Sequence, residues 1–212
     1  MSFEEASVAD IDQLVCRLQA PLGFEDALSA LGVSPRNTSA VERFLNSTST
    51  RVLSVTEVLI AFDPGKPPTA SRFTDGNYPV LYTAIERQTA IDEIQHHVLK
   101  RLRATVPADA YYEIVSYRVK GAGKDFRPMR ARMPFLSSAD DVIAYPLCQA
   151  IGRKAKEYPL ALILTPSARN EGGGCVPVFE SAAIDAQSAR LEGVVAFSYD
   201  KSTDQARFRD IA

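Results

Sequence analysis

The apolar residues of this chain form short runs of strand length, which alternate with amphipathic stretches of helical length. The most apolar run, Pro159 to Pro166, has proline at both ends and is far too short to span a bilayer. Strands and helices do not follow the regular alternation that a parallel sheet requires. We therefore expect an α+β fold, with one hydrophobic core for the 212 residues.

The first part of the chain is expected to be helical. Apolar positions from Val8 to Gln19 recur at helical spacing, and Phe24 to Leu31 and Ser39 to Leu45 form two shorter amphipathic stretches. We interpret residues 1–49 as a small N-terminal helical cap within the same domain as residues 50–212.

From Thr50 onward, the pattern predicts short strands with flanking helices. Arg51 to Phe62 is dense in Val, Leu and Ile and is expected to be a strand, and Lys120 to Arg132 is expected to be a solvated basic loop. The other expected strands are Pro79–Ala84, Tyr111–Val119, Leu160–Thr165, Val176–Glu180, Val194–Tyr199 and Ala206–Ile211, and the expected helices are Arg87–Arg103 and Ser138–Glu157, the latter with Ser138 as N-cap.

The charge balance argues against nucleic acid or an anionic membrane as a direct partner. The net charge is −2 and the sequence pI is about 5.8, so the protein has no general basic field. Any phosphate must therefore be bound by a local cluster of arginines. The acidic, amphipathic N-terminus does not resemble a signal peptide, and we expect a cytoplasmic protein.

Cysteine and histidine usage indicates neither a disulfide framework nor a metal site. The three cysteines are scattered without a CxxC pair, and the two histidines, His96 and His97, are adjacent. We therefore expect no metal cofactor and a reducing environment.

One local pattern could carry chemistry. Arg72 precedes a short buried strand that contains Tyr82, and Glu93 lies on the following helix beside the small Ala90. An arginine before a strand and a carboxylate on the next helix can meet at one cleft. Alternatively, Arg72 is a surface residue and Glu93 a solvated helix position that pairs with His97.

Two further segments are candidates of the same kind. Arg51 could clamp a diphosphate with its planar guanidinium, although an arginine at the start of a strand is more often a surface residue. Ser167 begins a polar, glycine-rich turn, Pro166 to Gly174, directly after a buried strand. This turn matches neither a Walker loop nor a dinucleotide fingerprint, and the sequence around Ser167 lacks the GxSxG pattern of a serine hydrolase.

The order of these residues resembles a known family, the RES-domain toxins. The resemblance runs from about Thr50 to Phe179 and includes SRFTDGNYPVLYTAIERQTAIDEIQHH and TPSARNEGGG. The residues that carry it are Arg51, Arg72, Tyr82, Glu93 and Ser167.

The resemblance implies an ADP-ribosyltransferase-like core and NAD as the substrate, without a metal. Toxins of this family cleave the nicotinamide–ribose bond as NAD glycohydrolases or phosphorylases, or transfer ADP-ribose to a protein such as phosphoribosyl pyrophosphate synthetase. They are paired with an Xre-type antitoxin whose end blocks the NAD cleft.

Carried over by residue, the resemblance gives each candidate a role. Arg51 and Arg72 would bind the phosphate-bearing part of NAD, and Tyr82 would stack on or orient the nucleotide. Glu93 would act at the ribose, with Ser167 near the nicotinamide; Glu93, Arg51 and Ser167 are the expected catalytic residues. The alternative is a non-catalytic module that binds a nucleotide or a partner.

Thr50 and the residues around Arg72 depart from the family pattern. Many members have an aromatic residue or histidine where this chain has Thr50, and Ser71, Thr74 and Asp75 replace the usual Gly and Asn. These differences concern the fine geometry of the site and the choice of acceptor.

Overall fold

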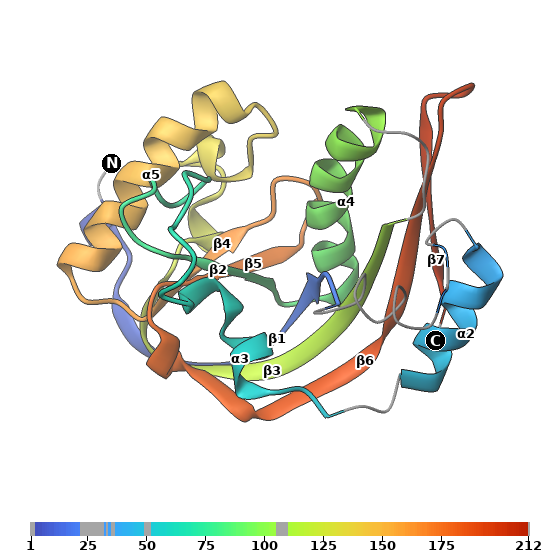
Figure 1. The fold of residues 1–212 in the computed structure, drawn as a ribbon. Coiled ribbons are helices and arrows are strands. Elements are labelled where there is room, and N and C mark those ends of the chain that lie inside the picture. Colours follow the sequence, from blue (N-terminus) through green and yellow to red (C-terminus); the bar gives the residue numbers. More distant parts are fainter. Residues whose placement is uncertain are drawn as a thin grey trace.

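A computed structural model of the chain describes residues 3–21, 32, 34, 37–48, 52–104 and 110–211. The fold is α+β, as the sequence predicts. Helices α4 and α5 lie on the same side of the long curved strands (Figure 1). The main helices are α2 (Thr38–Thr48), α3 (Val55–Val58), α4 (Arg87–Ala104) and α5 (Asp141–Glu157), and the strands are β1 (Val8–Gln19), β2 (Leu81–Ala84), β3 (Ala110–Asp125), β4 (Leu162–Pro166), β5 (Gly174–Val178), β6 (Ile184–Asp200) and β7 (Gln205–Asp210).

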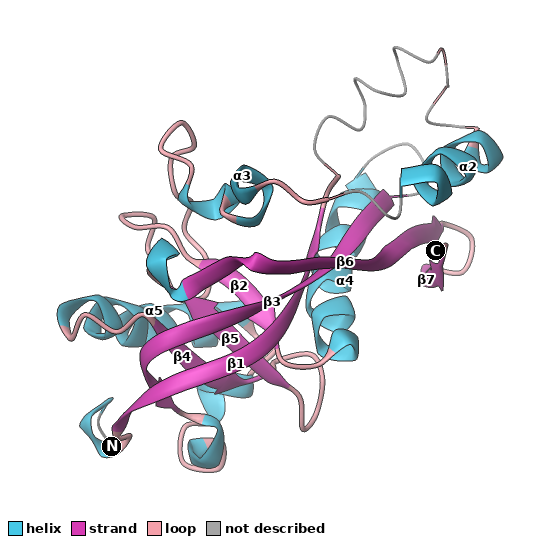
Figure 2. Cartoon of the chain, turned by 90° about the horizontal axis from the view of Figure 1, so that it is seen from below, coloured by secondary structure: helices cyan, strands magenta, loops and turns pink. Residues whose placement is uncertain are grey.

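The described strands form one sheet in the order β1-β2-β5-β4-β3-β6-β7. Strand β3 organises the sheet, because β1 pairs with it in antiparallel register from Val8↔Lys124 to Gln19↔Glu113. Its other edge pairs first with β6 and then, in parallel, with β4. Since β1 also reaches β2 at Cys16↔Ala84, strands β1 to β5 close into a ring. Figure 2 shows β1, β3 and β6 running side by side across the molecule.

The expected helix from Val8 to Gln19 is wrong, because this segment is strand β1. A short apolar run is compatible with both periods, and long-range pairing decides between them. Here twelve residues of β1 pair with β3. Val15, Cys16 and Leu18 become buried, whereas Val8 and Leu14, part of the apparent helical stripe, stay exposed.

The expected strand from Arg51 to Phe62 is also wrong. The described part of this segment forms α3 and the 3-10 helix Ile60–Phe62. Ser54 and Glu57 form a capping box: the Glu57 amide donates to Ser54 Oγ at 3.2 Å, and the Ser54 amide donates to Glu57 Oε2 at 2.7 Å. The Ser-x-x-Glu spacing is a helix-start signal that outweighs the apolar composition.

The expected strands from residue 79 onward and the helix Arg87–Arg103 are confirmed, but two strands are much longer than expected: β6 begins at Ile184, ten residues before Val194, and β3 runs on past Val119. The expected basic loop is wrong in its first part, since β3 continues to Asp125. Helix α5 begins later than expected: Asp140, not Ser138, is its N-cap, and its side chain accepts from the Val142 amide at 3.0 Å. The Ser39–Leu45 helix lies within α2, and the expected helix Phe24–Leu31 lies outside the described residues.

Two apolar clusters fix the helices that flank the site. Buried Ala90, Ile91 and Val98 pack α4 against β1, β2, β3 and β6. Buried Cys148 and Ile151 pack α5 against a second cluster that includes aromatic side chains. Gly152 lets α5 approach closely, because a Cβ there would lie 1.9 Å from the carbonyl oxygen of Phe73. The loop that carries Arg72 is thereby held against α5.

Candidate functional site

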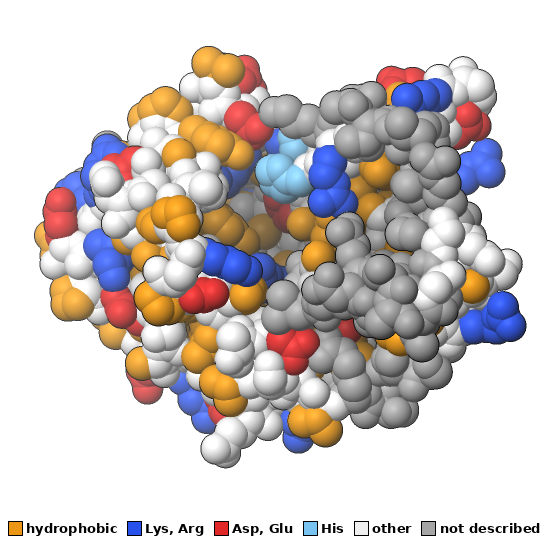
Figure 3. All heavy atoms as spheres, in the orientation of Figure 1, with side chains coloured by type: hydrophobic (Ala, Val, Ile, Leu, Met, Phe, Trp, Pro, Cys, Tyr) orange, Lys and Arg blue, Asp and Glu red, His pale blue; other side chains and the backbone are white. Residues whose placement is uncertain are grey.

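A cavity of about 300 Å³ opens between α4 and α5, above the ends of β2, β4 and β5. Figure 3 shows it as a hollow in the centre of this face, with a histidine side chain at its rim. Much of the wall is apolar, which is typical of ligand pockets in which a few polar groups set orientation. The polar side chains on the wall include those of Arg72, Tyr82, Glu93, Asp141, Tyr145 and Arg169.

The carboxylate of Glu93 is fixed by three donors that all reach the same oxygen. Ser167 Oγ donates to Glu93 Oε1 at 2.6 Å, and the Ala168 amide donates at 3.0 Å. The Cys175 thiol lies 3.7 Å from the same atom. Burial and the nearby Glu93 charge raise the pKa of Cys175 well above its ordinary value, so the thiol stays protonated and can donate. None of the described residues donates to Oε2 by a hydrogen bond.

Ser167 uses its whole hydrogen-bonding capacity within the protein. Its hydroxyl donates to Glu93 and accepts from the amides of Arg169 at 3.1 Å and Asn170 at 2.9 Å. A serine hydroxyl has one donor and two acceptor sites, and all three are filled. The side chain is also buried, so its direct effect in this structure is to orient Glu93 and shape the turn.

The glycine-rich turn joins β4 to β5 as a hairpin and is fastened to α4. Asn170 Nδ2 donates to Thr89 Oγ1 at 2.8 Å, and the Gly174 amide donates to Glu86 Oε2 at 3.0 Å. Gly173 is required for this contact, since a Cβ there would lie 2.3 Å from Thr89 Oγ1. The turn therefore couples Ser167 to the helix that carries Glu93.

Arg72 lies on the opposite side of the cavity, against the start of α5. Its Nη2 donates to the Ser138 carbonyl at 2.8 Å and lies 3.5 Å from Asp141 Oδ1. Its guanidinium carbon is 5.7 Å from the centre of the Tyr145 ring. The other terminal nitrogen, Nη1, is buried and has no hydrogen-bond partner among the described residues. An unsatisfied buried donor is costly, which is consistent with a ligand site.

Tyr82 lines the cavity with its ring while its hydroxyl holds the Arg72 loop. The hydroxyl accepts from the Phe73 amide at 2.8 Å and lies 2.8 Å from Ser71 Oγ. Burial raises the pKa of Tyr82, so the phenol remains neutral. Tyr82 thus offers an aromatic surface to a ligand and positions Arg72.

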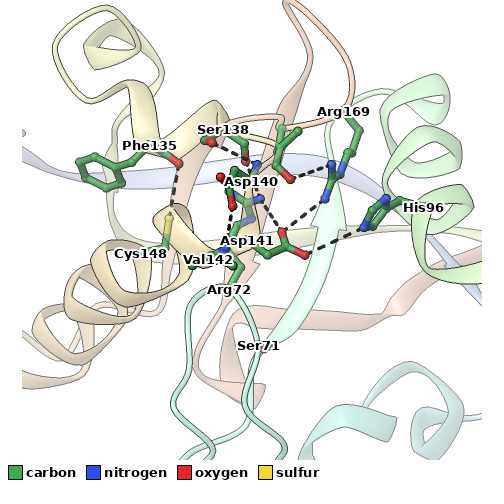
Figure 4. Close-up of polar contacts among 12 residues, drawn as sticks. Ser71, Arg72, His96, Phe135, Ser138, Asp140, Asp141, Val142, Cys148 and Arg169 are labelled. Atoms are coloured by element: carbon green, nitrogen blue, oxygen red, sulfur yellow. Dashed lines mark hydrogen bonds and ion pairs between the residues drawn. The ribbon is translucent and has the colours of Figure 1, made fainter. Parts of the chain in front are cut away.

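A second carboxylate, Asp141, was not identified by the sequence analysis, and it lies beside Arg72, Arg169 and His96. Arg169 Nη2 is 3.3 Å from Asp141 Oδ1, and His96 Nε2 is 4.0 Å from Oδ2 (Figure 4). Arg169 Nη1 also donates to the Ala139 carbonyl at 3.2 Å. Arg169 lies in the segment TPSARNEGGG, two residues after Ser167. Its closeness to this candidate residue is the sequence feature that could have identified it.

Arg17 on β1 is another cavity residue that sequence reasoning missed, because its segment was expected to be a helix. The residue lines the cavity, its Nη1 is buried without a hydrogen-bond partner among the described residues, and Tyr117 lies beside it. Burial lowers the pKa of Arg17.

The cavity brings together Arg72, Tyr82 and Glu93 and sets Ser167 directly behind Glu93. The fifth expected residue, Arg51, lies outside the described residues. Over the described part of the chain, no group of three His, Cys, Asp or Glu side chains is arranged to hold a metal ion. No described helix is both long and apolar enough to cross a membrane.

Comparisons with known proteins identify a family and a similar fold. A family model described as "RES domain" matches residues 51–201. The fold is similar to that of a chain in the crystal structure of the M. tuberculosis MbcT–MbcA toxin–antitoxin complex, with a TM-score of 0.53 and 16% sequence identity. That alignment covers 92% of this chain and 90% of the other. No curated protein matches the sequence.

Proposed function

The chain belongs to the RES domain family, and from this premise and the geometry of the cavity we propose that it cleaves the nicotinamide–ribose bond of NAD. The observation that carries the proposal is the Glu93 carboxylate, fixed through Oε1 by Ser167 and the Ala168 amide on the wall of the cavity. Its hydrogen-bond donors are neutral, so they orient the carboxylate without adding a positive charge beside it.

The chemistry explains why one fixed carboxylate matters. Nicotinamide leaves as a neutral ring from a cationic one, so its departure needs no general acid. Positive charge develops on the ribose, as in the oxocarbenium-like transition state of glycoside cleavage. Glu93 Oε2 opposes this charge and accepts a hydrogen bond from a ribose hydroxyl. A preorganised charge of this kind needs no reorganisation during the reaction.

The other cavity residues bind the remainder of NAD. Arg72, with Arg51, binds the phosphate-bearing part, where the guanidinium fork matches phosphate oxygens. The rings of Tyr82 and Tyr145 give the nucleotide an aromatic surface. Ser167 acts through Glu93 as a positioning residue. Binding energy from these distant contacts holds the ribose at the carboxylate.

We assign the cellular role of a toxin paired with an antitoxin of the Xre type. The support is the family and the fold shared with a chain of a toxin–antitoxin complex. The ADP-ribose acceptor is water or phosphate, which depletes NAD, or a protein such as phosphoribosyl pyrophosphate synthetase. The reaction requires no metal.

The test is nicotinamide release from NAD by the purified chain, free of antitoxin and in the presence of a chelator. The wild-type chain should release nicotinamide, and Glu93→Gln should reduce the rate by about a hundred- to a thousandfold, because it removes one preorganised electrostatic contact. Glu157→Gln, an exposed helix position on α5, is the matched control and should keep the wild-type rate.

The same reaction with labelled NAD and a cell lysate identifies the acceptor. Label on a protein indicates transfer, whereas free ADP-ribose or its phosphate ester indicates NAD degradation. A wild-type chain that binds NAD without releasing nicotinamide would instead be the non-catalytic module, and the proposed activity would be wrong.

A further inference from the structure

Arg72 and Arg169 reach one carboxylate from different elements of the fold. Arg72 comes from the loop before β2, Arg169 from the β4–β5 turn, and Asp141 from the first turn of α5. Both arginines lie within 3.5 Å of the same oxygen, Asp141 Oδ1 (Figure 4). All three residues line the cavity. Two cations therefore converge at one point on its wall.

We propose that Arg169 is a second anion-binding residue, that with Arg72 it binds the diphosphate of the substrate, and that Asp141 is a built-in counter-ion which the diphosphate displaces. This inference deepens the proposed function and takes the identity of the ligand, a nucleoside diphosphate ester, from it. The binding of a diphosphate group itself rests on the geometry of the three residues.

Asp141 satisfies the two guanidinium groups only in part. Its contacts of 3.3 and 3.5 Å are longer than the roughly 2.7–2.9 Å of a charge-assisted hydrogen bond. Arg72 Nη1 has no hydrogen-bond partner among the described residues. A diphosphate offers several oxygens to the same two groups, so it can fill donor positions that one carboxylate leaves open.

The positions of the cations do not depend on Asp141. Arg72 donates to the Ser138 carbonyl and Arg169 to the Ala139 carbonyl, both in the segment just before α5. The arginine side chains are 14% and 15% exposed, whereas that of Asp141 is 39% exposed. The carboxylate is therefore the member of the cluster that can turn toward solvent while the arginines stay in place.

The charges of the cluster indicate which anions can enter. Two guanidinium groups and one carboxylate leave one positive charge, and burial together with Arg169 and His97 lowers the pKa of His96, which keeps its imidazole neutral near pH 7. A single negative charge gains little by replacing Asp141, which is itself favoured at the N-terminus of α5. A diphosphate with two negative charges gains more. Asp141 thus selects for diphosphates over monoanions.

The test is to measure, by calorimetry at low and high salt, the affinity of the protein for inorganic pyrophosphate and for ADP-ribose. Arg169→Ala should weaken both by about tenfold or more, since one of two charge-assisted contacts is lost. Asp141→Asn should tighten both by about three- to tenfold and should increase acetate binding relative to pyrophosphate, because the competing charge is gone. Arg153→Ala, a partly exposed arginine on α5 that pairs with Asp75, is the control and should change neither.

Arg169→Gln keeps a donor for the Ala139 carbonyl without the charge, and should behave as Arg169→Ala if the turn stays folded. Weaker pyrophosphate binding by Asp141→Asn would show that Asp141 organises the arginines, and unchanged binding by both Arg169 variants would remove Arg169 from the site; either result overturns the proposal. If pyrophosphate binds as expected but NAD releases no nicotinamide, the anion site stands and the proposed activity fails. If NAD is cleaved but the Arg169 variants bind pyrophosphate as the wild type does, the proposed activity stands and the role of Arg169 in the anion site fails.

Discussion

The cavity contains two carboxylates in opposite electrostatic surroundings. Glu93 is held at 2.6 and 3.0 Å by neutral donors, a hydroxyl and an amide, and each contact is a hydrogen bond. Asp141 lies at 3.3 to 4.0 Å from two guanidinium groups and an imidazole. Neutral donors hold the Glu93 carboxylate in place without offsetting its charge. The guanidinium groups offset the charge of Asp141, although their longer contacts hold it less firmly. The surroundings of Glu93 suit a group that stabilises a developing positive charge. The surroundings of Asp141 suit a counter-ion that an incoming anion can displace.

Moving the fixed charge without removing it should lower the rate almost as much as removing it by Glu93→Gln. Glu93→Asp keeps the carboxylate but withdraws it from Ser167 and from the ribose. We expect a loss of about a hundredfold in nicotinamide release, the scale of a misplacement of about one ångström. Steady-state rates with NAD measure it, and an affinity for ADP-ribose equal to that of the wild type is the control. A wild-type rate would show that exact placement is unimportant and that the two carboxylates differ less than their contacts indicate.

Removing the Ser167 hydroxyl, a neutral donor to Glu93, should lower the rate of NAD cleavage less than Glu93→Asp does. It should also lower the free energy of unfolding measurably. Ser167→Ala removes the donor to Glu93 and leaves the amides of Arg169 and Asn170 without their acceptor. We expect unfolding to become easier by about 1–3 kcal/mol, the cost of unsatisfied buried donors. The maximal rate should fall about tenfold, the equivalent of one such hydrogen bond.

Denaturant unfolding and NAD cleavage check this prediction, with Ser202→Ala in the exposed β6–β7 turn as the control. A loss of NAD affinity without a loss of maximal rate would mean that Ser167 contacts the substrate directly, as the family resemblance implies.

The sulfur contact to Glu93 is the weakest of the three and should matter least. The raised pKa of Cys175 predicts a thiol that resists alkylation at pH 8, because the thiolate is the reactive form. Cys175→Ser should keep the rate within about threefold of the wild type, because the serine hydroxyl can donate in place of the weakly donating thiol. Mass spectrometry after iodoacetamide treatment of the folded chain checks the first point. Rapid modification of Cys175 would contradict its assignment as a protonated donor.

The smallest effect concerns the pH dependence near Asp141. Burial and the positive charge of Arg169 lower the pKa of His96, so the folded protein takes up this proton less readily than the unfolded chain. As pH falls through the ordinary histidine range, the unfolded state gains a proton first, and stability is lost. His96→Gln removes this contribution, so its stability should fall less than that of the wild type between about pH 7 and 5. Denaturant midpoints across this range measure the difference; parallel curves would mean that His96 titrates normally.

The sequence predicted the part of the site that local order determines. Arg72, Tyr82 and Glu93 lie on a short strand and the elements on either side of it, so their order in the chain indicated that they could meet at one cleft, and the family resemblance favoured this interpretation over that of surface residues. Ser167 comes from a distant strand, and only the family resemblance placed it with the others.

The parts that could not be predicted depend on pairing between remote segments. Asp141 and Arg169 meet because α5 and the β4–β5 turn converge, a relation that neither segment encodes alone. Strand β1 is the clearest case. Its apolar residues fit a helix, and only 12 pairings with β3, about a hundred positions later, make it a strand.

That same pairing has a consequence for the time at which the protein becomes active. Strand β1 supplies Cys16, Arg17 and Leu18 to the cavity wall, yet it precedes residues 51–201, the span of the family match. During synthesis β1 lacks its twelve-residue pairing until β3 is made, since β2 offers it a single paired position, and the ring closes only after β5. At about 5–20 residues per second, this is a delay of many seconds in which the chain exists without a binding site. Because such long-range contacts form slowly, assembly of the sheet adds to the delay. For the toxin role proposed above, the chain would thus emerge inert from the ribosome, and the proposed antitoxin would have this interval in which to reach it.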